Sequence, residues 1–173
     1  MTSTGTAATR LIILRGNSGS GKSTVARALR AARPRGDVAL VSRDVVRREV
    51  LGVHDTAGNP SVELLDLMVR FALDRGFSVV LEGILYPPTY APMLRGLTAD
   101  HVGCTLGYFW DLAFEETLHR HESRQVRVDY GEAEMRRWWL GRALVDGLDE
   151  RSFNAALSVD AAVATILADA GWT

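Results

Sequence analysis

Residues 16–23 read Gly16-Asn17-Ser18-Gly19-Ser20-Gly21-Lys22-Ser23 and match the pattern G-x-x-x-x-G-K-[ST] at every position. The apolar run 11–14 before this segment is typical of a buried parallel strand, and residues 22–32 after it have the composition of a helix that ends before Pro34. The glycines allow a loop whose backbone N–H groups converge on phosphate oxygens, while the helix adds the positive end of its dipole. A strand, this loop and a helix in that order predict a phosphate-binding loop.

Two side chains of this loop are suited to binding a nucleotide. Lys22 can reach the β- and γ-phosphates of ATP, and the hydroxyl of Ser23 can ligate Mg²⁺. Lys22 is also the only lysine in a chain with 20 basic residues, which favours a functional position over an accidental one. We therefore expect ATP and Mg²⁺ as cofactors and a catalytic role for Lys22. The residues of this segment expected to contact the nucleotide are Gly16, Asn17, Ser18, Gly19, Ser20, Gly21, Lys22, Ser23 and Thr24.

The sole lysine also excludes one large class of proteins with such a loop. A small GTPase carries an N-K-x-D motif that recognises its base, and this chain has no second lysine to form one. Its 173 residues are too few for the usual core of a motor or transporter ATPase. The formal net charge of −1 argues against a dedicated nucleic-acid binder, although it leaves room for a local basic groove. A small kinase is the class that remains.

Apolar runs and helical periodicities alternate along the rest of the chain. Strands are expected at residues 38–42, 77–81, 103–110 and 151–153. Helices are expected at residues 61–75, 87–97, 112–123, 132–148 and 159–170, with a short one between Asp44 and Val50. Strands that alternate with helices predict an α/β fold in which a parallel sheet carries helices on both faces.

The ends of the chain and its composition set the expected organisation and location. Residues 1–9 are small and polar, so we expect a flexible tail followed by one domain over residues 10–173. No apolar stretch approaches the length of a membrane-spanning helix. The single cysteine, Cys104, has no partner for an internal disulfide, which fits a reducing compartment. We therefore expect a cytoplasmic protein without a membrane partner.

From Arg10 to about Trp139 the chain resembles the nucleoside-monophosphate-kinase-like P-loop kinases. It is most similar to the small kinases grouped with zeta toxins and polynucleotide 5′-kinases. The resemblance implies a three-layer fold with a five-stranded parallel sheet in the order 2-3-1-4-5. It also implies a small lid over about residues 124–132.

The segment Ser42-Arg43-Asp44, with Arg47 following, resembles the acceptor-side motif of polynucleotide kinases. The resemblance implies that Asp44 takes the proton of the acceptor hydroxyl as a catalytic residue and that Arg47 contacts an anionic substrate group. A carboxylate at the carboxyl end of a strand beside the loop strand would face the crevice where ligands bind. Two alternatives stay open, because Asp44 can cap the following helix and Arg47 can lie on a solvated helix face.

Residues 81–85, L-E-G-I-L, resemble the E-G-I-L segment of uridine kinases. Glu82 takes the place of the aspartate that ends the corresponding strand in many P-loop proteins, and it could hold Mg²⁺ through water or contribute to the acceptor site. The expected metal-site residues are therefore Ser23 and Glu82, and the expected substrate-binding residues are Asp44, Arg47 and Glu82. The alternative for Glu82 is a structural carboxylate bonded by backbone N–H groups.

Residues 110–124 resemble the helix that leads into the lid of adenylate-kinase-like enzymes. This match implies that Arg120 packs its guanidinium on the adenine ring and that Arg124 reaches the transferring phosphates as a catalytic residue. A spacing of four puts both on one helix face, and arginine suits the two tasks through planar stacking and charge. Arg127 is a weaker candidate in the same lid. The alternative is an arginine-rich, exposed helix.

The expected reaction moves the γ-phosphoryl group of ATP to a hydroxyl of a small-molecule or nucleoside-type acceptor. Three alternatives stay open. The chain can be a polynucleotide 5′-hydroxyl kinase that binds a nucleic acid 5′ end, an antibiotic- or sugar-modifying kinase of the zeta-toxin type, or a nucleotide-gated regulatory module without turnover. The sequence does not name the acceptor, because acceptor pockets are built from scattered side chains.

Overall fold

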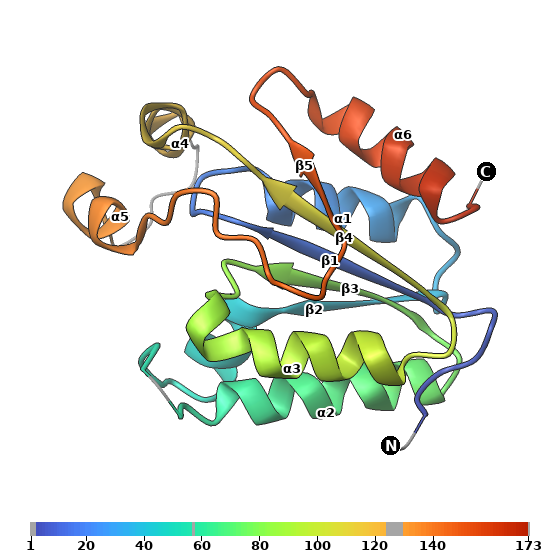
Figure 1. The fold of residues 1–173 in the computed structure, drawn as a ribbon. Helices are drawn as coiled ribbons and strands as arrows, with labels where there is room; N and C mark the ends of the chain where they lie inside the picture. The colour runs from blue at the N-terminus through green and yellow to red at the C-terminus, as the bar shows by residue number, and fades with distance from the viewer. Residues whose placement is uncertain (1–2, 57, 124–129, 173) are drawn as a thin grey trace.

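The computed structural model describes residues 3–56, 58–123 and 130–172. At its centre lies one sheet of five parallel strands in the order β2-β3-β1-β4-β5 (Figure 1). The strands are β1 (Arg10–Gly16), β2 (Val38–Ser42), β3 (Ser78–Gly83), β4 (Cys104–Trp110) and β5 (Glu150–Phe153). The α/β class and the strand order expected for this chain are confirmed.

The middle strand, β1, is buried because its apolar residues face both helical layers. Leu11 and Ile13 belong to the core cluster on one face of the sheet, and Ile12 and Leu14 belong to the cluster on the other. This division follows from the period-two alternation of side chains along a strand. In the register with β3, Leu14 lies opposite Glu82. The loop that leaves the carboxyl end of β1 therefore starts beside the carboxyl end of β3.

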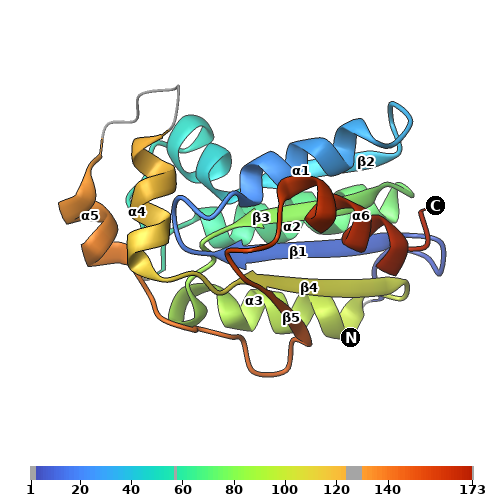
Figure 2. The same cartoon turned by 90° about the horizontal axis from the view of Figure 1, so that it is seen from above.

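Helices cover both faces of this sheet. On one face lie α1 (Lys22–Ala31) and α6 (Val159–Asp169), and on the other lie α2 (Ser61–Asp74) and α3 (Pro87–Asp100) (Figure 1). Beyond the carboxyl ends of the strands lie α4 (Phe114–Glu122) and α5 (Glu132–Trp138), at the end of the molecule opposite the chain termini (Figure 2). A π-helical turn, η1 (Val45–Val50), follows β2. Among the helices of the described ranges, none is both long and apolar enough to cross a membrane.

The helix expected over residues 132–148 ends at Trp138, so the prediction is wrong for its second half. Residues 139–149 form an irregular segment. Its first backbone groups bond to a side chain of the phosphate-binding loop, since Asn17 accepts from the N–H of Leu140 and donates to its carbonyl. Backbone groups that find partners elsewhere do not need a helix to satisfy them.

A buried ion pair holds the rest of this irregular segment against the sheet. Arg15 Nη1 lies 2.7 Å from Glu150 Oε1, and both side chains are almost fully buried. Glu150 also accepts from the N–H of Val145, while Arg15 donates to the carbonyls of Ala143 and Leu85. Each charged group of the pair therefore has hydrogen-bond partners besides the other group, which a buried ion pair requires.

The described part of the expected tail at residues 1–9 is packed against the body of the protein. Thr4 forms a β-bridge with His101, and its hydroxyl donates to Asp74 at 2.7 Å. Thr9 Oγ1 lies 3.0 Å from a ring nitrogen of His101. The described residues of this segment therefore have hydrogen-bond partners on the body of the protein, among them the buried His101.

Candidate functional site

The loop between β1 and α1 depends on glycine at three positions. Gly16, Gly19 and Gly21 have φ angles of 142°, 81° and 96°, in the left-handed region that favours glycine. At Gly19 a Cβ atom would also meet the carbonyl oxygen of Thr117 at 2.4 Å. The loop therefore packs directly against the backbone of α4.

We expect Gly19→Ala to lower the melting temperature and to weaken ATP binding, because alanine adds both a strained φ angle and a collision with α4. The left-handed backbone alone costs roughly 1–2 kcal/mol, and each kcal/mol shifts the Tm of a chain of this size by roughly 2–4 °C. Gly36→Ala is the matched control, since Gly36 has a φ angle of 89° and open space where a Cβ would stand. Melting curves and ATP titrations that give equal losses for both variants would contradict the close packing.

Lys22 lies under the loop with its ammonium group bonded to loop oxygens. Nζ donates to the carbonyl of Asn17 at 2.7 Å and to Ser20 Oγ at 3.0 Å. The residue is only 6% exposed. The ammonium group thus joins two residues of the loop and adds a full positive charge to the partial charges of its N–H groups.

The side chains of Asn17 and Ser18 contact residues far along the chain. The side-chain amide of Asn17 forms two hydrogen bonds with the backbone of Leu140. Ser18 Oγ lies 2.9 Å from Tyr130 Oη. These bonds occupy both side chains, and in a phosphate-binding loop it is the backbone N–H groups that bind phosphate. Sequence reasoning missed Tyr130 and Leu140, because these contacts join positions 112 and 123 residues apart and leave no local pattern.

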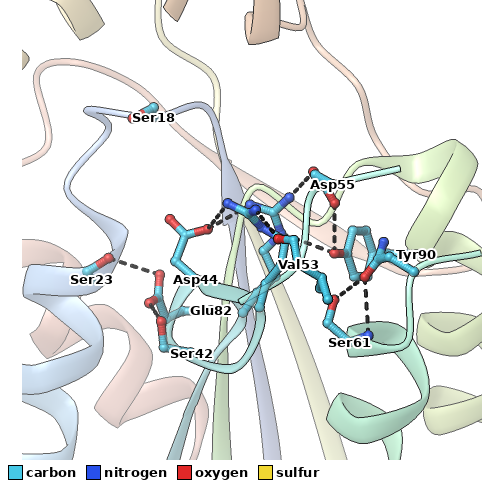
Figure 3. Close-up of polar contacts among 12 residues, drawn as sticks. Ser18, Ser23, Ser42, Asp44, Val53, Asp55, Ser61, Glu82 and Tyr90 are labelled. Atoms are coloured by element: carbon cyan, nitrogen blue, oxygen red, sulfur yellow. Dashed lines mark hydrogen bonds and ion pairs between the residues drawn. The ribbon is translucent and has the colours of Figure 1, made fainter. Parts of the chain in front are cut away.

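A second group, which we call the Glu82 cluster, consists of Ser23, Ser42 and Glu82 (Figure 3). Ser23 Oγ donates to Glu82 Oε2 at 3.0 Å, and Ser42 Oγ donates to Oε1 at 2.5 Å. These bonds join the start of α1, the end of β2 and the end of β3. Among the described residues the partners of this buried carboxylate are two hydroxyl groups, and no backbone N–H group there bonds to it.

The oxygens of the Glu82 cluster fit a magnesium ion. Mg²⁺ prefers hard oxygen ligands and is bound in kinases by few protein groups, with water and phosphate completing its coordination. Ser23 Oγ and the Glu82 carboxylate supply such oxygens side by side. Within the described part of the chain there is no group of three or more His, Cys, Asp or Glu that would form a cage made of protein alone.

Asp44 lies between the Glu82 cluster and the arginines near η1 (Figure 3). Its Oδ1 accepts from Arg43 Nη1 at 2.6 Å, and its side chain is 49% exposed. Burial opposes ionisation, but the charges of Arg43, Arg48 and Arg47 and the hydrogen bond from Arg43 outweigh it and hold the pKa of Asp44 below its ordinary value. Asp44 occupies the N-cap position of η1 without a capping hydrogen bond, so the capping alternative is not observed.

Arg43 is a buried residue to which sequence reasoning gave no role of its own. Its Nη1 bonds Asp44, its Nη2 bonds Asp55, and its Nε donates to Tyr90 Oη at 3.1 Å. Tyr90 Oη in turn donates to Asp55 Oδ1 at 3.1 Å (Figure 3). Arg43 therefore holds the carboxylate of Asp44 and is itself held by Asp55 and Tyr90.

Arg47 is buried, so the alternative of a solvated helix face is wrong. Its Nη1 donates to the carbonyl of Val53 at 2.8 Å, and its Nη2 lies 4.0 Å from Asp44 Oδ1. These contacts put Arg47 on the same side of η1 as Asp44. Burial, followed by the charges of Arg43 and Arg48, lowers the pKa of the Arg47 guanidinium.

Beside these residues lies a cavity of about 610 Å³. The volume is within the usual range for small-molecule sites. On one side the cavity is bounded by η1, the residue that follows β2, the loop after η1 and the segment after β3. On the other side it is bounded by the end of α5 and the start of the irregular segment. Its lining residues are Arg43, Arg47, Arg48, His54, Asp55, Thr56, Ile84, Tyr86, Arg137, Trp138 and Leu140.

Arg120 lies on the other side of the loop. Its Nη1 donates to the carbonyl of Ser20 at 3.2 Å, its Nη2 donates to the carbonyl of Ala155 at 3.0 Å, and its Nε bonds Glu116. The guanidinium therefore bridges α4, the loop and the segment after β5, and the alternative of a plain exposed helix does not describe it. Arg124, Arg127 and most of the expected lid lie outside the described residues.

The comparisons with known proteins agree with this architecture. A family model described as an AAA domain (AAA_33) matches residues 11–148. A sugar kinase from Janibacter sp. HTCC2649, in an unliganded structure, is similar with a TM-score of 0.67 and 18% identity, over 92% of this chain and 93% of its own. No match was found among curated proteins.

Two further solved structures share the fold. The Mycobacterium tuberculosis APS kinase, in complex with AMPPNP and APS, is similar with a TM-score of 0.67 and 18% identity, over 99% of both chains. A chain of the Pnkp1/Rnl/Hen1 RNA repair complex is similar with a TM-score of 0.57 and 21% identity, over 79% of this chain and 43% of its own. At such identities the likeness establishes the fold alone, and the expected P-loop kinase fold is confirmed.

Proposed function

This chain belongs to the AAA domain family AAA_33, and on that premise we propose that it is an ATP-dependent phosphotransferase. It would move the γ-phosphoryl group of ATP to a hydroxyl of a small-molecule or nucleoside-type acceptor. One observation carries the proposal: Asp44 lies near the Glu82 cluster of the phosphate-binding loop (Figure 3), and it is bonded to Arg43, which lines the arginine-rich cavity. A phosphoryl donor and an acceptor would meet at this carboxylate.

Each group has a role in the proposed transfer. Lys22 and the loop N–H groups would bind the β- and γ-phosphates and stabilise the charge on the transferring group. Ser23 and Glu82 would hold Mg²⁺, which supplies further neutralisation of phosphate charge. Asp44 would orient the acceptor hydroxyl and accept its proton, while the hydroxyl oxygen bonds to the γ-phosphorus and ADP leaves. Arg124 is proposed to contact the transferring phosphates from the lid.

The direct test is transfer of the labelled γ-phosphoryl group of ATP, in the presence of Mg²⁺, to a panel of acceptors. The panel holds small alcohols, sugars, sugar acids, nucleosides, aminoglycosides and a 5′-hydroxyl oligonucleotide. We expect label in at least one small acceptor, with equal formation of ADP. ATP binding without transfer to any acceptor would instead favour the nucleotide-gated regulatory module.

A polynucleotide 5′-hydroxyl kinase is the second candidate. It is favoured by the arrangement of Asp44 with Arg43 and the buried Arg47, because these are the residues that carry the resemblance to that family. In the panel above, this candidate requires that the 5′-hydroxyl oligonucleotide accept label faster than any nucleoside. The zeta-toxin-like candidate requires that a sugar or an aminoglycoside accept label faster than any nucleoside.

We expect tighter binding of ATP than of GTP. Arg120 is held beside the loop by Ser20 and Ala155, where its planar guanidinium offers a stacking surface for adenine. The chain has no N-K-x-D motif that would favour guanine. Calorimetry with both nucleotides at matched Mg²⁺ measures the preference. Tighter GTP binding would contradict the adenine role of Arg120.

A further inference from the structure

The charge around the cavity is one-sided. Four guanidinium groups line it, from Arg43, Arg47, Arg48 and Arg137, and the only carboxylate among the lining residues is that of Asp55. The chain as a whole has a formal net charge of −1, so this is a local concentration of positive charge. Such a concentration attracts anions to the cavity.

The nearby carboxylates compensate only one of these arginines fully. Arg43 bonds both Asp44 and Asp55. Arg47 is paired less closely, since its ion pair with a carboxylate in the described ranges is the 4.0 Å contact between Nη2 and Asp44 Oδ1. Its Nε is also buried and has no hydrogen-bond partner among the described residues. The lowered pKa of Arg47, from burial and then from the charges of Arg43 and Arg48, agrees with a guanidinium surrounded by like charge.

Arg48 and Arg137 reach the same cavity from two different elements. Arg48 belongs to η1 and Arg137 to α5, and within the described ranges neither forms an ion pair with a carboxylate. The guanidinium carbon of Arg48 lies 5.5 Å from the ring centre of Tyr130. The neighbouring Arg136 differs, because it pairs with Glu132 and does not line the cavity. Of these two neighbouring arginines of α5, the one without a carboxylate partner in the described ranges is therefore the one that lines the cavity.

We propose that Arg48 and Arg137, with the buried Arg47 beside them, form an anion subsite for the acceptor. The acceptor is then a small hydroxylated molecule that carries a phosphate or carboxylate group, with its hydroxyl at Asp44. Guanidinium groups match such oxyanions with paired, charge-assisted hydrogen bonds. The inference rests on the proposed function, and it selects one substrate class within it.

The same charges select against other acceptors. A cationic amino sugar would be repelled by the arginines, and a neutral sugar would leave them without a counter-charge. A cavity of about 610 Å³ has the size of a site that encloses a small molecule. The subsite therefore favours a compact anionic acceptor over an aminoglycoside or an oligonucleotide.

The first experiment compares acceptors that share a hydroxyl skeleton and differ only in charge. One series is glycerol, glycerate and glycerol phosphate, and the other is glucosamine, glucose, gluconate and glucose phosphate. We expect kcat/KM for the best anionic member to exceed that of its neutral parent by about 10-fold to 100-fold, the value of one or two charge-assisted hydrogen bonds. The two anions separate a phosphate subsite from a carboxylate subsite. Equal use of neutral and anionic members, or a preference for a 5′-hydroxyl oligonucleotide, would overturn the inference.

The second experiment assigns the preference to residues. Arg48→Gln and Arg137→Gln should each raise KM for the anionic acceptor by about 10-fold, with kcat, KM for ATP and activity on the neutral parent nearly unchanged. Arg136→Gln is the matched control, because it removes the same charge from the same helix outside the cavity. All three side chains are exposed, so melting temperatures should stay close to that of the wild type. Equal effects of Arg136→Gln and Arg137→Gln would contradict the subsite.

A third measurement separates failure of the subsite from failure of the proposed function. Calorimetry with glycerol phosphate, glycerate, glucose phosphate and gluconate, on protein saturated with a non-hydrolysable ATP analogue and Mg²⁺, reports binding without turnover. Binding that depends on Arg48 and Arg137 but leads to no transfer would support the subsite and reject the phosphotransferase. Transfer to neutral acceptors with no binding of any anion would reject the subsite and leave the phosphotransferase standing.

Discussion

Replacing Lys22 with alanine should reduce phosphoryl transfer by about 100-fold to 1,000-fold, the usual contribution of a single charged or hydrogen-bonding group at the transition state. Lys22 is the only lysine in the chain, and its ammonium group bonds the loop that binds phosphate. Neutralisation of the β- and γ-phosphates would be lost with it. The measurement is single-turnover transfer from labelled ATP to the best acceptor, together with ATP affinity by calorimetry.

The burial of Lys22 calls for a second variant. Because Nζ bonds Asn17 and Ser20, alanine removes two loop contacts as well as the charge. Lys22→Met keeps the length and apolar volume of the side chain and removes the charge, so it should lose transfer to a similar degree with a melting temperature nearer to the wild type. Near-normal turnover by a folded Lys22→Met protein would contradict the role of the loop in catalysis.

The elements of this fold could be predicted because their signals are local. The segment 16–23 indicates the loop between a strand and a helix, and the helix expected over residues 159–170 is observed as α6 (Val159–Asp169). Parallel strands bring their carboxyl ends to one edge, so Asp44 and Glu82 could be expected near the loop before the structure was known.

The rest of the site depends on contacts that no short segment encodes. Tyr130 meets Ser18, and Arg137 of α5 lines the same cavity as Arg48 of η1. The composition of residues 132–148 predicts a segment that is mostly helix. It could not reveal that Asn17 bonds the backbone just beyond the observed end of that helix. Long-range hydrogen bonds overrode local propensity there.

Asp44→Asn should lower the rate of transfer by about 100-fold to 10,000-fold, the usual range for loss of a general base. The amide keeps the shape of the carboxylate and can still accept from Arg43, so the ATP affinity should stay unchanged. The side chain is about half exposed, and exposed ion pairs contribute little to stability, so the melting temperature should change by only a few degrees. Glu49→Gln is the matched control, because it removes the same charge from an exposed position of η1.

The pH dependence gives this prediction a second measurement. Because nearby arginines hold the pKa of Asp44 below its ordinary value, the carboxylate is ionised at neutral and mildly acidic pH in the folded protein. Wild-type transfer that depends on this group should therefore persist as the pH falls and be lost only when the pH approaches the lowered pKa. Asp44→Asn should remove that acidic limb from the rate profile. A variant with wild-type turnover and an unchanged profile would reject Asp44 as the base and leave Glu82 as the next carboxylate at this edge of the sheet, since it lies beside the same loop through Ser23.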